Sequence, residues 1–154
     1  KMVHPKYRDI TPEMIPKIES DAGTVAVVAG RYQGKDGATR CEYVDVRFLD
    51  IAMHPDKTMK LETVPEDTVF AYLVEGTCAF DEGMRLQEPK RAFLFSKGDE
   101  IVLQSGPQGA RLVLVSGPPL REPVAWGGPI VMNTERELRD AFFELQNGTF
   151  IKHS

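Results

Sequence analysis

The chain of 154 residues has few of the side chains that bind metals or cross-link a fold: two cysteines and three histidines. Cys41 and Cys78 lie far apart and form no CxxC pair, which excludes a disulfide scaffold and predicts two reduced thiols. The histidines, His4, His54 and His153, are dispersed and form no HxH, HxxxH or HExxH pattern. Because a mononuclear iron or zinc site needs three or four ligands at one point, we predict no metal site in this chain.

Long apolar runs and clustered positive charge are also lacking. The longest apolar runs are about six residues, far shorter than the roughly 20 that span a membrane. Residues 1–5 contain no apolar segment typical of a signal peptide. The net charge is −4 and no basic block is prominent, which argues against direct nucleic-acid binding. These features predict a cytoplasmic protein, or one present in both cytoplasm and nucleus.

Helical patterns are lacking before residue 134, and β patterns are present instead. Short apolar or alternating runs recur at roughly 8–12-residue spacing, with turn residues between them. The predicted strands cover residues 24–29, 43–51, 58–63, 69–74, 77–80, 91–95, 101–104 and 111–115. Because βαβ units would need helices between the strands, the pattern predicts an all-β sandwich or barrel.

The distribution of prolines suggests how the chain is divided. Prolines at positions 5, 12 and 16 disfavour both helix and central strand, so residues 1–16 are predicted to form an extended arm or interdomain linker. The β-barrel is predicted over residues 17–120. A C-terminal segment, residues 121–154, completes the chain.

One helix is predicted at about residues 134–147, in the C-terminal segment. Thr134 and Glu137 have the spacing of a capping box, in which each side chain bonds to the other residue's backbone N–H. One apolar face follows at helical spacing: Leu138, Ala141, Phe142 and Leu145. Phe143 points away from this face; an ordinary exposed hydrophobe is the favoured interpretation, and contact with a partner is the alternative.

No nucleophile or anion-binding pattern is evident. Cys78 lies in a β run and is predicted to be a small core residue, whereas Cys41, next to Arg40, is the better candidate for a reactive thiol. No G-x-S-x-G elbow is present. The glycine-rich residues 106–109 precede a strand and not a helix, so they form no phosphate loop. Paired carboxylates adjoin turns and are predicted to be solvated: Glu66-Asp67, Asp81-Glu82 and Asp99-Glu100.

Two stretches near the C-terminus carry a family resemblance. Gly128-Pro-Ile-Val-Met-Asn-Thr134 follows the run Gly117–Trp126, which reads G-P-P-L-R-E-P-V-A-W. With the amphipathic helix, these stretches resemble the C-terminal end of pirins. The opening Lys1–Tyr7 and, more loosely, Phe70–Gly76 are also similar, so the resemblance spans essentially the whole chain. It implies a cupin-type barrel (a double-stranded β-helix, or jelly roll) with one C-terminal α-helix.

Pirins resemble two cupin barrels in tandem, and the resemblance also implies where a cofactor would lie. The family's iron is held by three histidines and a glutamate of the N-terminal barrel. That barrel has no expected counterpart in this chain, so we expect no cofactor here. The family includes iron-dependent quercetin dioxygenases and nuclear transcriptional cofactors, and either activity would belong to a two-domain protein.

The general cupin motifs can be placed on this chain through their glycines. With the last glycine of the first motif at Gly76, the glutamate position falls on Val69, and the histidine positions fall on Glu62 or Thr63 and on Val64 or Pro65. With the second motif beginning at Gly98, its inner glycine is Gly106 and its histidine position is Gly109. The turn glycines Gly76, Gly98 and Gly106 are therefore retained for backbone geometry, while the ligand positions Glu62, Val64, Val69 and Gly109 are degenerate.

Three hypotheses for function remain open at this point. The leading one is a metal-free C-terminal cupin domain of a pirin-like protein, non-catalytic by itself, with a structural and protein-interaction role. Its predicted partners are the N-terminal pirin domain, a second copy, or a transcription-related protein. The contact residues expected are Met2, Tyr7, Ile10, Met14 and Trp126. The alternatives are a fragment of an intact iron-dependent quercetin (flavonol) dioxygenase and a standalone cupin that binds a small apolar molecule in its interior.

Overall fold

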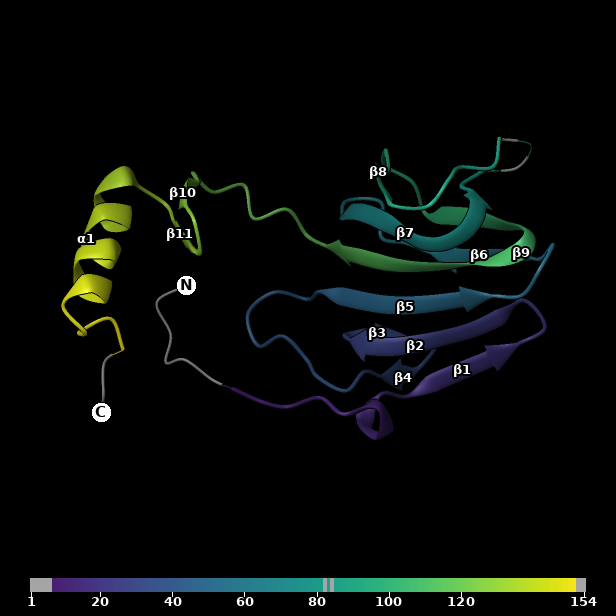
Figure 1. The fold of residues 1–154 in the computed structure, drawn as a ribbon, viewed down its shortest axis with the longest axis horizontal. Helices are drawn as coiled ribbons and strands as arrows, with labels where there is room; N and C mark the ends of the chain where they lie inside the picture. Colours follow the sequence, from purple (N-terminus) through teal and green to yellow (C-terminus); the bar gives the residue numbers. More distant parts are fainter. Residues whose placement is uncertain (1–6, 82, 84, 152–154) are drawn as a thin grey trace. The chain divides into compact units, whose positions relative to one another are not determined.

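A computed structural model describes residues 7–81, 83 and 85–151 of the chain (Figure 1). These residues form two compact units: residues 10–119, and residues 120–151 together with residues 7–9. Residues 10–16, which we expected in an extended arm, therefore belong to the unit that holds most of the strands. The backbone N–H of Val27 donates to the carbonyl of Pro16 at 2.9 Å and fixes the end of this segment to the sheet.

The elements of the first unit are short except for two long strands. They are a 3-10 turn, η1 (Pro12–Met14), and the strands β1 (Lys17–Ser20), β2 (Gly23–Ala29), β3 (Arg31–Tyr32), β4 (Lys35–Asp36), β5 (Arg47–Met53), β6 (Thr58–Glu62), β7 (Thr68–Ala79), β8 (Arg91–Leu94) and β9 (Glu100–Gly117). The second unit contains β10 (Ala125–Gly127), β11 (Ile130–Met132) and the helix α1 (Glu135–Gln146).

An antiparallel sheet of order β1-β2-β5-β9-β7-β8 forms the first unit, and β6 pairs on β9 as well. β9 is long enough to pair with β6 and β5 along the same edge: β6 pairs with residues 100–104 of β9, and β5 pairs with residues 110–116. The sheet curls so that residues of β1 and β2 line one pocket together with residues of β6. The first unit is therefore a curled antiparallel barrel (Figure 1).

Two pairs of predicted strands are continuous in the structure. Residues 69–74 and 77–79 lie on the single strand β7, which ends one residue before the predicted limit, and residues 101–104 and 111–115 lie on β9. The intervening glycines were read as turns, but Gly76 and Gly109 take positive φ of 70° and 77° within paired strands. Such φ values let a strand bend without breaking its ladder, and the register of β7 on β9 shifts between Gly76 and Cys78.

The first strands of the barrel also differ from the sequence prediction. β5 begins at Arg47 and not at residue 43, and β1 was not predicted. A two-residue turn, Gln33-Gly34, connects β3 to β4, and its residues have φ of 44° and 80°. Positive φ at both central residues is typical of the two-residue hairpin turns that match strand twist.

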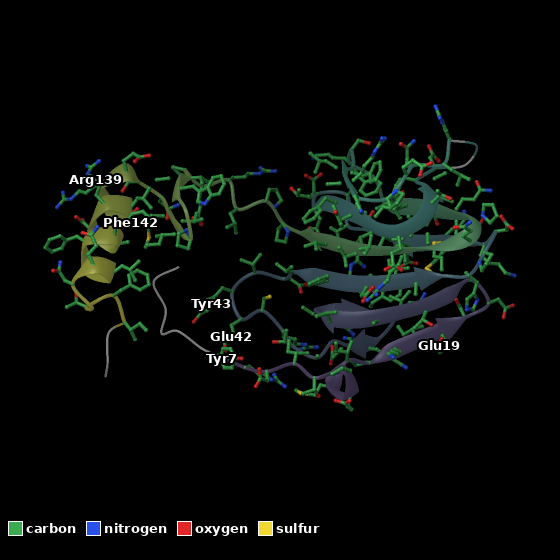
Figure 2. All side chains as sticks on the ribbon, in the orientation of Figure 1. Tyr7, Glu19, Glu42, Tyr43, Arg139 and Phe142 are labelled. Atoms are coloured by element: carbon green, nitrogen blue, oxygen red, sulfur yellow. The ribbon has the colours of Figure 1, made fainter. Side chains whose placement is uncertain are left out.

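Inward and outward side chains alternate along the strands, and the inward ones form the core of the barrel. On β5 the inward residues Leu49, Ile51 and Met53 are buried, while Phe48 and Ala52 face outward. The inward side chains of the strands form one apolar cluster (Figure 2), whose largest fully buried members are Val27, Leu49, Ile51, Leu61, Leu73, Leu103, Leu112 and Leu114. This continuous cluster is what stabilises the barrel.

The second unit has its own small core. β10 and β11 pair as a hairpin, and α1 buries Leu138 and Ala141 in a cluster with Ala125 and Ile130. Phe142 packs against this cluster and is labelled on the helix in Figure 2. Leu145, expected on the same face, is exposed. None of the described helices is long and apolar enough to cross a membrane.

Hydrogen bonds at the start of α1 have the reciprocal form of a capping box. The hydroxyl of Thr134 accepts from the backbone N–H of Glu137 at 3.2 Å. The carboxylate of Glu137 accepts in return from the backbone N–H of Thr134 at 2.8 Å. Two otherwise unsatisfied donors of the first helical turn are thereby bonded.

Candidate functional site

The interior of a small β-barrel is a place where a ligand or a metal can bind. Among the described residues the buried polar side chains are Ser105 and Ser116. The hydroxyl of Ser105 donates to the carbonyl of His54 at 2.6 Å, and that of Ser116 accepts from Arg47 at 3.2 Å. Both hydroxyls are thus engaged by the protein itself, and apart from the Tyr32 hydroxyl and the Cys78 thiol the other side chains of the core cluster are apolar.

The degenerate cupin positions do not meet at one point. Val69 is buried in the core and pairs with Ser116, at one end of the β7–β9 ladder. Glu62 ends β6, and Val64 follows it in an exposed loop. Gly109 lies beside Gly76, which pairs with Ala110 seven residues further along β7. At roughly 3.3 Å per residue, the seven positions along β7 separate Val69 from Gly76 by about 20 Å.

The three glycines assigned to turn geometry occupy two kinds of position. A Cβ on Gly76 would overlap the carbonyl oxygen of Gly109, and one on Gly106 would overlap the side-chain hydroxyl of Thr77. Gly76 and Gly106 therefore lie within paired strands where β7 and β9 approach closely. Gly98 precedes β9 in an open position, where the nearest atom to a Cβ would be 3.8 Å away.

The described residues do not fit an iron centre. They contain no group of three or more His, Cys, Asp or Glu side chains arranged to hold a metal ion. Of the three histidines, His54 is described; its ring Nδ1 lies 3.3 Å from the carbonyl oxygen of Asp21 at the surface. His4 and His153 lie outside the described residues.

The two cysteines have opposite surroundings. Cys78 is fully buried, and burial raises the pKa of its thiol to about 11, only partly offset by a hydrogen bond with the backbone of Gln104. Its thiol donates to the carbonyl of Ala79 at 3.2 Å. Cys41 is exposed and free. Because a buried neutral thiol is inert, Cys41 is the more accessible nucleophile of the two.

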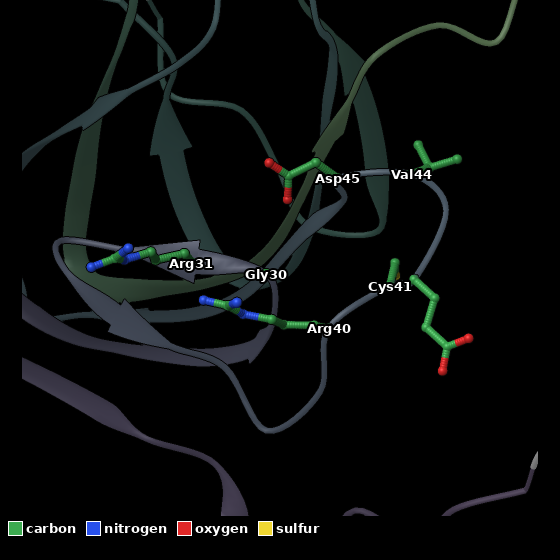
Figure 3. A pocket seen from close by; sticks show the side chains of 7 residues that line it. Gly30, Arg31, Arg40, Cys41, Val44 and Asp45 are labelled. Carbon is green, nitrogen blue, oxygen red and sulfur yellow. The ribbon is translucent and has the colours of Figure 1, made fainter.

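Cys41 lines a surface pocket of about 440 Å³ together with Gly30, Arg31, Arg40, Glu42, Val44 and Asp45 (Figure 3). Arg31 and Arg40 both engage the same carboxylate oxygen of Asp36, and the Arg31 contact is long, at 3.9 Å. Hydrogen bonding and charge from Arg40 lower the pKa of Asp36. The pocket is thus lined by an exposed thiol and by two guanidinium groups that share the Asp36 carboxylate.

An exposed apolar row crosses four neighbouring strands on the outside of the barrel. In register, Phe48 of β5 faces Val115 of β9, Val115 faces Phe70 of β7, and Phe70 faces Leu94 of β8. In the next row Val113 faces Tyr72. We name these six residues, Phe48, Phe70, Tyr72, Leu94, Val113 and Val115, the outer apolar patch. Leu94 is 76% exposed, so the patch presents apolar surface to solvent.

Sequence reasoning missed the outer apolar patch, although a signal for it is present. Residues 69–74 read Val-Phe-Ala-Tyr-Leu-Val, which is apolar on both alternating faces. One face is the core, through Val69, Ala71 and Leu73, and the other carries Phe70 and Tyr72. A strand apolar on both faces indicates either burial on both sides or an uncovered apolar surface.

The residues predicted from the sequence to form an interface lie on both units. Tyr7 is 89% exposed, and Trp126 is 72% exposed. Trp126 pairs with Val131 across the β10–β11 hairpin, on its outer face. Ile10 is half-buried and Met14 is exposed, and Met2 lies outside the described residues. Their role in an interface stays a prediction.

A curled antiparallel barrel whose long strands are bent at closely packed glycines defines the protein as a cupin, as predicted, and one C-terminal helix follows the barrel in the chain. Residues 48–151 match the family description "Pirin C-terminal cupin domain". The chain belongs to the pirin family, and the resemblance found in the sequence is confirmed.

Known relatives agree with this assignment. The chain is 34% identical to "Pirin" of Rattus norvegicus, over 96% of the chain and 51% of that protein. It is 35% identical to a Thermoplasma acidophilum protein provisionally named a quercetin 2,3-dioxygenase, over 99% of the chain and 61% of that protein. The fold superposes on a crystal structure of quercetin 2,3-dioxygenase from Acinetobacter baumannii with a TM-score of 0.85 and 26% identity. That match covers 94% of this chain and 50% of the other, so the chain spans between half and two thirds of its relatives' length.

Proposed function

We propose that this cupin domain acts without a metal, in a structural and protein-interaction role, by covering its outer apolar patch with another barrel. The observation that carries the proposal is the contrast between the two faces of β7. The inward face contributes to a core of apolar side chains, and the outward face exposes Phe70 and Tyr72 beside Leu94. Such a surface is typical of protein contacts.

The partner that suits this patch best is a second cupin barrel. In a two-domain relative it would be the iron-binding N-terminal barrel, which this domain would support. In the chain alone it would be a second copy. Fully burying Leu94 would contribute about 1.5–3 kcal/mol, and the neighbouring aromatic side chains would add to that.

Sedimentation of purified chain variants tests the proposed contact. We expect the chain to self-associate at high concentration and Leu94→Glu to shift it to monomer, because a carboxylate in the patch would be desolvated on contact. The matched control is Ala52→Glu, which adds the same charge to the outward face of β5 but outside the patch. A monomeric chain at all concentrations, or equal association of both variants, would contradict the proposal.

Similarity to quercetin 2,3-dioxygenase of Acinetobacter baumannii favours a second candidate, in which the chain is the C-terminal half of a flavonol dioxygenase. Iron in that case would be bound by the other half, since the described residues here do not fit it. We expect no quercetin consumption by this chain with added iron and oxygen. Turnover by the isolated chain would assign the chemistry to this domain.

The cellular setting is also a proposal. Two free cysteines fit a reducing compartment, so we place the domain in the cytoplasm, or in cytoplasm and nucleus. A transcription-related protein partner, as in nuclear pirins, would be bound through the same outer apolar patch.

A further inference from the structure

Two adjoining pockets open where the curled sheet brings β1 and β2 opposite β6. The larger, of about 460 Å³, lies among charged side chains, and the smaller, of about 220 Å³, lies among Ile18, Val25 and Met59. Both pockets are lined by Tyr32 and Lys60. We name the two together the mouth groove. Its size is in the usual range of small-molecule sites.

Arg47 is the central charged group of the mouth groove. Its guanidinium donates to the hydroxyl of Ser116 at 3.2 Å and to the backbone carbonyl of Glu62 at 2.9 Å. Both acceptors are neutral, and Arg47 forms no ion pair with a carboxylate of the described chain. These two bonds fix the half-buried guanidinium while its charge remains unmatched. A fixed guanidinium is well suited to bind a carboxylate.

Tyr32 supplies a second polar group. The residue is buried, and its hydroxyl accepts a hydrogen bond from the amide of Gln33 at 3.3 Å. The hydroxyl proton has no acceptor among the described residues. Burial raises the pKa of Tyr32, with an opposing effect of the nearby Arg47 charge, so the phenol stays a donor at neutral pH.

The rim of the groove carries charges of both signs. Arg31 and Lys60 add two positive charges, and Glu62 and Glu100 add two negative ones. Lys60 lies 3.0 Å from Glu100, so this carboxylate is already paired. Arg31 likewise lies 3.9 Å from Asp36, so Arg47 is the cation of the lining that has no ion pair among the described residues.

We infer that the mouth groove binds a small amphipathic organic acid. Its carboxylate would accept from the guanidinium of Arg47 and the hydroxyl of Tyr32. Its apolar body would lie against Ile18, Val25 and Met59. Binding there is independent of the outer apolar patch and of any metal.

Titration with 2-naphthoate, beside the neutral 2-naphthamide, tests this site in the purified chain. Calorimetry gives the affinity, and amide NMR shifts locate the contact. We expect saturable binding of the acid, at least about tenfold tighter than that of the amide, because a charge-assisted hydrogen bond is lost in the amide. The largest shifts should fall on residues 31–34, 47 and 58–60.

Variants identify the groups responsible. Arg47→Gln should weaken binding of 2-naphthoate about tenfold, and Tyr32→Phe, which keeps the ring, by a few-fold. Arg40→Gln makes the same charge change at an exposed site outside the groove and should leave affinity unchanged. If Arg47→Gln fails to fold, Tyr32→Phe and the acid-to-amide comparison decide the matter. Equal binding of acid and amide, no saturation up to about 10 mM, or shifts confined elsewhere would overturn the inference.

Discussion

The carbonyl oxygen of Gly109 occupies the space that a side chain on Gly76 would need. Both residues have positive φ, and they lie on the two long strands that join the parts of the barrel. A Cβ on Gly109 would in turn lie 2.5 Å from the carbonyl oxygen of Met53. β9 therefore lies close to both β7 and β5 at positions where glycine leaves room.

Replacing Gly76 by alanine should destabilise the barrel by about 3 kcal/mol. The variant incurs both the left-handed backbone penalty, about 1–2 kcal/mol, and a clash with backbone that cannot move aside. Gly34→Ala is the matched control, because Gly34 has a φ of 80° but open space around its Cα. It should lose only about 1 kcal/mol. Urea unfolding followed by circular dichroism measures both, and equal losses would show that the close approach is not what requires Gly76.

Cys78 should make stability depend on pH above about 9. Burial raises the pKa of its thiol from 9.0 to about 11, so between these values the unfolded chain loses a proton that the folded chain keeps. The free energy of unfolding therefore falls as pH rises above about 9, by at most about 1.4 kcal/mol per pH unit. Below pH 9 the stabilisation that the neutral Cys78 thiol contributes is fully present. Cys78→Ala removes the thiol, so the difference between the two proteins in the pH dependence of unfolding free energy belongs to Cys78 and not to other titrating groups. The loss of stability caused by the smaller side chain is the same at every pH. Identical slopes for the two proteins would contradict the prediction.

The two cysteines should also differ in reactivity. A thiol reagent at neutral pH should modify Cys41 in the folded protein and Cys78 only after denaturation, because one is exposed and the other fully buried. Mass spectrometry of the labelled peptides distinguishes the sites. Cys41→Ser should abolish labelling of the folded chain, and rapid labelling of Cys78 in native buffer would be the contrary result.

The capping box should contribute about 1 kcal/mol to the stability of α1. Glu137→Ala removes the acceptor for the backbone N–H of Thr134, whereas Glu137→Gln keeps one. Hydrogen exchange of the amides in residues 138–146 measures helix opening. Exchange should accelerate about fivefold in Glu137→Ala and much less in Glu137→Gln; similar acceleration in both would show that charge, and not the hydrogen bond, stabilises this turn.

The fold could be predicted from the sequence where local signals are strong. Capping residues and helical spacing located α1, and alternating apolar runs located the main strands. The continuity of β7 and β9 could not be predicted, because a glycine that ends a strand and one that bends it look the same in sequence. The distinction depends on a partner backbone, as at Gly76 and Gly109, which are 33 residues apart in the chain.

The candidate sites were less accessible to sequence reasoning. Placing the cupin motifs by their glycines set Val69 and Gly109 in one ligand group, whereas the β7–β9 ladder separates them by about seven residues along the strands. The mouth groove combines Tyr32, Arg47 and Lys60 from three strands, and no local pattern connects them. The outer apolar patch depends on register across four strands, so only its β7 segment left a signal in the sequence.

We propose that this cupin domain functions without a metal of its own. Elemental analysis of the purified chain by plasma mass spectrometry, after growth in iron-supplemented medium and without chelators, tests it most directly. The packed apolar interior predicts far less than one equivalent of iron, zinc, manganese or copper per chain. One equivalent of a metal that is retained on gel filtration and bound by protein side chains would contradict the claim.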